Sequence, residues 1–236
     1  MPSKRPPLVN GEIYHTVIRT VENLKLFRDE KDYFRMIHDL FEFNDTSPVS
    51  SNFRFFQKSK LTGSDPDSYK RGVREMLVEI LAFCLMPNHV HLLLRQIRDG
   101  GISQFMKKIG GGYGVYYNQR HKRVGHLFQG KYRLVHIEND KQLYTIFVYV
   151  HTNPVAIIFP GWKERGIEDA KKVINFARDY RWSSYPDYLG VKNFPSLTSR
   201  EFLAETMGGV KGCKEAVDSW LEFKKELADF EKVAIE

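Results

Sequence analysis

Residues Leu77–Leu94 read LVEILAFCLMPNHVHLLL, two apolar runs separated by Pro87 and Asn88. Each run is short and continuous, which is typical of a strand buried inside a sheet. The Pro-Asn pair between them supplies turn chemistry. The stretch therefore predicts a tight β-hairpin, with Leu77–Met86 and His89–Leu94 as its two strands.

Further elements are predicted on both sides of this hairpin. β-Branched residues favour strands, and apolar residues at three- and four-residue spacing favour helices. These patterns predict strands at 12–21 and 131–137, a helix capped by Asp29, a helix over 102–117 and a helix from a cap at Asp140 to about Asn153. The resulting order β-α-β-β-α-β-α predicts an α+β fold, a ferredoxin-like (RRM-like) antiparallel sheet with helices packed on it.

Three consecutive glycines interrupt the apolar pattern of the predicted helix at 102–117. Each of Gly110, Gly111 and Gly112 weakens a helix by about 1 kcal/mol relative to alanine. The triplet therefore predicts either a break in the helix or a close approach of another chain segment.

The sequence divides near residue 160. Residues 1–160 are predicted to form the first domain, with a long insertion at about 44–72 that is rich in Ser, Pro and Gly. Residues 161–236 are predicted to form a mostly helical extension, with a Thr198–Glu201 capping box and a terminal amphipathic helix. We expect that helix to pack onto the first domain, with a dimerisation helix or a partner site as the alternative. Its apolar face is formed by Ala216, Trp220, Phe223, Leu227 and Phe230.

Composition restricts the classes of protein. Cys84 and Cys213 do not form a CxxC pair, which argues against a disulfide framework or a thiolate zinc site. The N-terminus lacks the apolar stretch of a secretion signal, and the sequence has no run long enough to span a membrane. We therefore expect a cytoplasmic protein that has no membrane partner.

Positive charge is concentrated in one segment. The net charge is +7, and the segment 100–137 contains seven basic residues and no Asp or Glu. A solvated lysine-rich face is the alternative, but such faces usually contain acids as well. The segment therefore predicts a phosphate-binding surface formed by Lys107, Lys108, Arg120, Lys122, Arg123, Lys131 and Arg133.

Two histidines of the hairpin and one helical tyrosine are the candidates for chemistry. His89 and His91 alternate with Val90, so both imidazoles lie on the same face of their strand. Two histidines on an apolar strand favour metal binding, because unbound polar groups are costly to bury. Tyr149 and Asn153 lie one turn apart and off the apolar stripe of their helix, although periodicity alone favours an ordinary surface tyrosine.

The stretch Met86–Leu94 (MPNHVHLLL) resembles the signature of single-tyrosine HUH transposases of the IS200-like superfamily, especially the REP-associated tyrosine transposases. Three further segments are similar to family segments in the same order: Gly125–Arg133, Tyr149–Val155 and Trp182–Tyr185. The resemblance implies that His89 and His91 are metal ligands, that Asn153 is a third ligand and that Tyr149 is the nucleophile.

The resemblance also implies a function. The expected protein is a metal-dependent endonuclease and transposase that uses Mg²⁺ or Mn²⁺ to cut and rejoin single-stranded or hairpin-forming DNA through a 5′-phosphotyrosine. Two alternatives remain, a catalytically inactive nucleic-acid-binding protein and a metal phosphodiesterase that uses activated water. We expect a monomer or homodimer that is associated with the nucleoid when DNA is bound.

Overall fold

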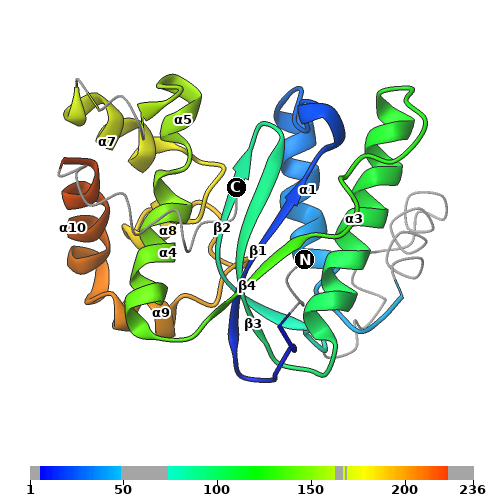
Figure 1. The fold of residues 1–236 in the computed structure, drawn as a ribbon, viewed down its shortest axis with the longest axis horizontal. Helices are drawn as coiled ribbons and strands as arrows, with labels where there is room; N and C mark the ends of the chain where they lie inside the picture. Colours follow the sequence, from blue (N-terminus) through cyan, green and yellow to red (C-terminus); the bar gives the residue numbers. More distant parts are fainter. Residues whose placement is uncertain (1–5, 49–73, 163–166, 168, 223–236) are drawn as a thin grey trace, which may run out of the picture.

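Four strands form one antiparallel sheet in the order β2-β3-β1-β4 (Figure 1). The computed structural model describes residues 6–48, 74–162, 167 and 169–222. The strands are β1 (Ile13–Arg19), β2 (Val78–Met86), β3 (His89–Gln96) and β4 (Arg133–Ile137). β2 pairs with β3 across the Pro87-Asn88 turn, so the predicted hairpin is confirmed.

One face of the sheet is covered by α1 (Glu30–Glu42) and α3 (Gly101–Arg120) (Figure 1). α1 begins where predicted, because the Asp29 carboxylate accepts hydrogen bonds from the backbone N–H groups of Lys31 and Asp32. Val90 packs into this layer, so the two flanking histidines face the other side. The 3₁₀ turn Val21–Asn23 connects β1 to this layer.

α3 runs without interruption through its three glycines. The predicted break is therefore absent, but the predicted close approach is found at Gly112. A Cβ atom there would lie 2.3 Å from Cε2 of the Phe43 ring. Glycine thus allows the C-terminal end of α1 to approach α3.

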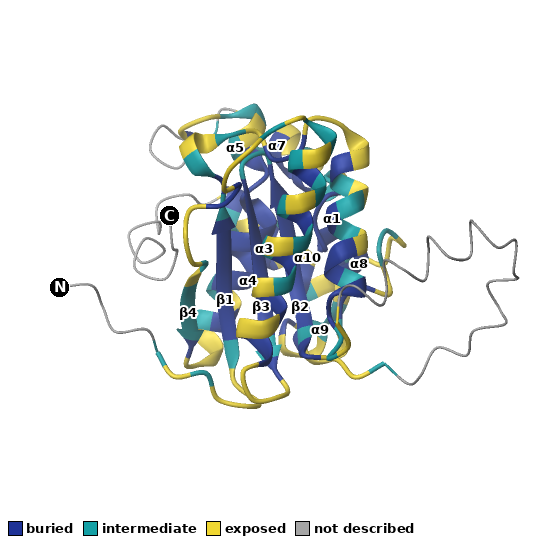
Figure 2. Ribbon diagram, turned by 90° about the vertical axis from the view of Figure 1, so that its right-hand side faces the viewer, coloured by how far each residue is buried: buried dark blue, intermediate teal, exposed yellow. Residues whose placement is uncertain are grey.

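The other face is covered by α4 (Asp140–Thr152) and the C-terminal helices (Figure 1). These helices are α5 (Val155–Ile158), α7 (Ala170–Asp179), α8 (Tyr185–Tyr188), α9 (Glu201–Thr206) and α10 (Gly209–Glu222). Side chains from β2, β3, α4, α7 and α10 share one apolar core. Residues 170–222 thus complete the second layer of the fold, and buried residues fill both layers (Figure 2).

Two predicted helix caps are wrong. Asn139 caps α4, because its side chain accepts from Gln142 N–H, and Asp140 is the first helical residue. α9 follows Arg200 without a side-chain cap, and Thr198 Oγ1 instead accepts from the Arg200 guanidinium at 3.0 Å. Most of the predicted insertion, 49–72, lies outside the described residues, as do Phe223, Leu227 and Phe230.

The fold class predicted from the sequence is confirmed, with helices on both faces of the sheet. Among the described residues, none of the helices is both long and apolar enough to cross a membrane.

Candidate active site

Three histidines and a tyrosine meet on the α4 face of the sheet. His91 in β3 lies opposite Val17 of β1, and His15 lies two residues before Val17. Side chains alternate along a strand, so His15 and His91 are diagonal neighbours on one face. Tyr149 reaches the same place from α4, which packs over β2 and β3.

The rings are in close contact. His15 Nε2 lies 3.0 Å from His91 Nδ1, and the two rings are nearly parallel with centroids 5.2 Å apart. The His89 and His91 centroids are 4.7 Å apart at an interplanar angle of 75°. The Tyr149 ring lies edge-on to both His91, at 5.5 Å, and His15, at 6.0 Å. Tyr149 and the histidine pair, 58 residues apart in sequence, are thus brought together as the prediction required.

Hydrogen bonds orient both predicted ligand histidines. His89 Nδ1 lies 2.5 Å from the Asn88 side-chain oxygen, which can only accept, so Nδ1 carries the proton and Nε2 the lone pair. His91 Nδ1 lies against His15 Nε2, so Nε2 is the ring nitrogen of His91 that points away from this contact. When His15 accepts this bond, Nε2 of His91 also carries a lone pair.

His15 is neutral at physiological pH. Burial, with a smaller contribution from the nearby His89, lowers its pKa to about 3. A neutral imidazole can accept a hydrogen bond from His91, as the partner of a metal-binding histidine does. The ring chemistry of His15, His89 and His91 therefore fits a divalent cation held by two Nε2 atoms. Within the described ranges, no three His, Cys, Asp or Glu side chains are placed to hold a metal ion together.

Tyr149 is more buried than its helical position predicted. Its exposed fraction is 2%, because the whole stretch Ile146–Asn153 is enclosed between the sheet and the C-terminal helices. The expectation that Tyr149 lies off the core face is therefore wrong. Tyr144, which is 48% exposed, and His151, which bonds Ser184 Oγ at 2.8 Å, take no part in the ring contacts with His15 and His91.

Asn153 ends α4 one turn beyond Tyr149. Its backbone N–H donates to the Tyr149 carbonyl at 3.1 Å, and its side chain is buried. In the described part of the chain, its Nδ2 atom has no hydrogen-bond partner. The structure shows no direct bond between Asn153 and the histidines, so its role as a third ligand stays a prediction.

Three of the seven basic residues at 100–137 are engaged within the protein. Arg120 pairs with Asp29 at 2.6 Å and with the buried Asp32, and its hydrogen bond lowers the Asp29 pKa to about 2. Lys108 donates to the backbone carbonyls of Asp45 and Ser47. Arg123 donates to the carbonyls of Gly125 and His126. Arg120 is thus opposed by acids at the start of α1, whereas Lys108 and Arg123 keep their charge and bond to backbone carbonyls. The absence of acids within the segment therefore does not leave all seven charges unopposed.

The other four basic residues, Lys107, Lys122, Lys131 and Arg133, are better placed to contact a ligand at the surface. Lys107 and Lys131 line a surface cleft beside α3. Lys122 follows the C-terminal end of α3 with a φ of 50°. Arg133 is exposed at the start of the edge strand β4 and lies opposite Val17, which in turn lies opposite His91. Arg133 therefore shares the face of the sheet that presents His91.

Two residues of this face were not among the candidates predicted from the sequence. His15 contacts His91, and Arg19 lies directly opposite His89 in the β1–β3 register. Both occupy alternate positions of the predicted strand at 12–21. Alternation places them on one side of that strand, but only the pairing of β1 with β3 shows that this is the histidine side.

One family of known proteins matches part of the sequence. Residues 67–153 match the family model described as "Transposase IS200 like". This segment is similar to the IS200-like transposases. The predicted resemblance is thus confirmed, and the matching segment contains His89, His91, Tyr149 and Asn153.

A solved structure of a REP-associated tyrosine transposase bound to a REP hairpin is similar at 13% identity. The match covers 82% of this chain and 90% of that chain with a TM-score of 0.45. No curated protein matches the sequence. The match to the IS200-like transposase family supports a function as a DNA transposase.

Proposed function

We propose that the protein is a metal-dependent endonuclease and transposase that cuts and rejoins single-stranded or hairpin-forming DNA through a 5′-phosphotyrosine on Tyr149. The observation that carries this proposal is the edge-on contact of the Tyr149 ring with the His91 ring, at 5.5 Å. It brings a phenol ring against His91, whose ring in turn contacts His89, and the Nδ1 atoms of both histidines are already occupied. A nucleophile and a cation site together are what phosphodiester transfer requires.

Each residue of the site has a separate role in the proposed reaction. Nε2 of His89 and of His91 would hold a divalent ion, Mg²⁺ or Mn²⁺, with the Asn153 amide oxygen as third ligand. That ion would supply stabilisation of the negative charge that develops on the non-bridging phosphate oxygens. Arg133 is exposed on the same face and would hold the neighbouring phosphate.

The proposed reaction exchanges one phosphoester for another. The Tyr149 oxygen attacks phosphorus and loses its proton, while the bond from phosphorus to the 3′-oxygen breaks and that oxygen leaves as a 3′-hydroxyl. The protein then carries the 5′ end of the downstream strand as a phosphotyrosine. Attack by a 3′-hydroxyl on this ester reverses the step and rejoins DNA, so no external energy source is needed.

His15 and Asn88 act as positioning residues in this proposal. Each occupies Nδ1 of a ligand histidine and so directs the Nε2 atom toward the ion. Such outer partners tune metal affinity without touching the metal or the DNA. The proposed protein acts in the cytoplasm, at the nucleoid, as a monomer or homodimer.

The test is the Tyr149→Phe variant, which removes one oxygen and keeps the ring that packs against His15 and His91. Wild-type protein incubated with 3′-labelled hairpin DNA and Mn²⁺ should give a covalent adduct that survives denaturant and is removed by protease. The variant should bind the same DNA and form no adduct. Tyr144→Phe is the matched control, because Tyr144 lies on the same helix and is 48% exposed.

Three outcomes separate the proposal from its alternatives. An adduct with Tyr144→Phe and none with Tyr149→Phe supports the proposal. Cleavage by Tyr149→Phe without any adduct would show a phosphodiesterase that uses activated water. DNA binding by the wild-type protein without cleavage would show a catalytically inactive binding protein.

A further inference from the structure

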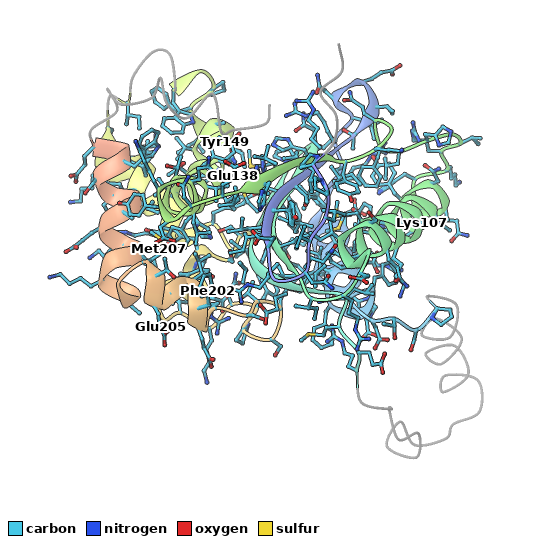
Figure 3. The ribbon with its side chains drawn as sticks, turned by 60° about the horizontal axis from the view of Figure 1, so that its bottom comes forward. Lys107, Glu138, Tyr149, Phe202, Glu205 and Met207 are labelled. Carbon is cyan, nitrogen blue, oxygen red and sulfur yellow. The ribbon has the colours of Figure 1, made fainter. Side chains whose placement is uncertain are left out.

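A surface cleft of about 630 Å³ lies between α3 and the loop that leads into β4. Ile18 lines this cleft and belongs to the core under α1 and α3. The cleft is therefore on the opposite face of the sheet from His15 and His91. Figure 3 shows Lys107 of this cleft on α3, on the far side of the sheet from Tyr149 on α4. The proposed chemistry makes no use of this cleft.

The α3 wall of the cleft is bare backbone at Gly110 and Gly111. A Cβ at Gly111 would meet nothing within 4 Å, and one at Gly110 would make only ordinary contacts, the nearest at 3.7 Å to Ile18. Packing therefore explains Gly112, whose Cβ would strike Phe43, but it does not explain the other two. A helix exposes bare backbone in this way where another molecule approaches it closely.

The remaining walls combine an aromatic side chain with positive charge. Tyr132 and Phe128 contribute rings, and Lys107 and Lys131 are exposed beside them. No Asp or Glu is among the residues that line the cleft. Stacking on an aromatic ring and contact of lysines with phosphates are the means by which proteins hold single-stranded nucleic acid.

The cleft is continuous with the edge of the sheet. Tyr132 lines the cleft, and the next residue, Arg133, begins the edge strand β4 in the row of His91. Successive residues of an extended chain point to opposite faces. A DNA strand that leaves the cleft can therefore pass over the edge at Arg133 and reach the histidine face.

We propose that this cleft binds a short single-stranded segment of the DNA substrate, with one base stacked on Tyr132 and its phosphates held by Lys107 and Lys131. The inference rests on the proposed function and adds to it a second DNA contact on the face opposite the reaction. The flat wall at Gly110 and Gly111 lets the base or the sugar lie directly against the backbone of α3.

The experiment fills the cleft without damaging the fold. Gly111→Leu places a side chain in open space and removes a helix-weakening glycine, so the melting temperature should stay the same or rise. Affinity for fluorescein-labelled oligo-dT, measured by anisotropy, should fall about 10-fold or more, and Tyr132→Ala should weaken binding by a similar factor. Val115→Leu, at an exposed position of α3 outside the cleft, is the matched control.

Two further measurements distinguish binding in this cleft from the proposed reaction at Tyr149. Tyr149→Phe should bind oligo-dT as the wild type does, so a failure of the chemistry leaves the binding result intact. Replacing Lys107 and Lys131 together by alanine should reduce the slope of log affinity against log salt by about 1.4, at about 0.7 per phosphate contact. Wild-type affinity in Gly111→Leu, or equally tight binding of the mononucleotide dTMP, would overturn the proposal.

Discussion

The two neighbouring glycines Gly111 and Gly112 should respond in opposite ways to the same substitution. Replacing either by alanine removes the conformational cost of glycine in a helix interior, which stabilises the fold by about 1 kcal/mol. At Gly111 nothing lies within 4 Å of the new Cβ. At Gly112 the Cβ would lie 2.3 Å from Cε2 and 2.6 Å from Cζ of Phe43.

The difference between the variants isolates the steric cost, because the helix-propensity gain is common to both. Carbon atoms pack at about 3.5–4.0 Å, so the Phe43 ring must shift by more than about 1 Å to admit the methyl group. That ring is buried in the core between α1 and α3. Overpacking a core costs about 1–3 kcal/mol, and Gly112→Ala should be less stable than Gly111→Ala by this amount.

Urea unfolding followed by circular dichroism measures this difference through the midpoint, with the m-value unchanged. For a chain of this size the melting temperatures should differ by roughly 2–12 °C, at 2–4 °C per kcal/mol. Phe43→Leu should restore most of the stability that Gly112→Ala loses, and it should not stabilise the Gly111→Ala variant. Equal stability of the two alanine variants would refute the steric role of Gly112.

Three other predictions follow from the charges and histidines. Arg120→Ala should lower the melting temperature and leave the salt dependence of DNA binding unchanged. Arg133→Ala should leave the melting temperature unchanged and reduce the slope of log affinity against log salt by about 0.7. The reverse pattern would show that Arg120 contacts DNA. His15→Phe should weaken Mn²⁺ binding about 10–100-fold, measured from the electron paramagnetic resonance of free Mn²⁺, while wild-type affinity would deny that His15 positions His91. Burial lowers the His151 pKa from 6.5 to about 3. Below pH 6.5 the unfolded chain therefore binds a proton at His151 that the folded protein does not bind. The free energy of unfolding is unaffected by this proton above pH 6.5 and falls as pH is lowered toward 3. His151→Gln should reduce this acid dependence by up to about 1.4 kcal/mol per pH unit, and an unchanged urea-unfolding profile from pH 7 to 4 would contradict it.

Local patterns were sufficient for most of the fold. The hairpin of β2 and β3 follows from two apolar runs around Pro87 and Asn88, and the alternation of His89, Val90 and His91 correctly separates the two faces. These features depend on residues that are close in sequence. The cap at Asn139 was missed because the neighbouring Asp140 has the same capping chemistry, and α9 has no side-chain cap to predict.

The rest depends on contacts between distant segments. His15 and His91 are 76 residues apart, and Asp29 and Arg120 are 91 apart. The pattern of β1 shows that His15 is on one side of a strand, but the identity of its partner requires the strand order. Likewise, a basic residue in a segment without acids can still pair with acids from elsewhere, as Arg120 does with Asp29 and Asp32.

These contacts change where DNA is expected to bind. Once Lys108, Arg120 and Arg123 are assigned to contacts within the protein, the exposed charge of the segment is no longer spread along α3. Lys107 and Lys131 flank the cleft, and Arg133 follows at the edge of the sheet. The N-terminal end of β4 thus presents cations to both faces, and a single strand bound there can contact the bare wall of α3 on one side and approach Tyr149 on the other.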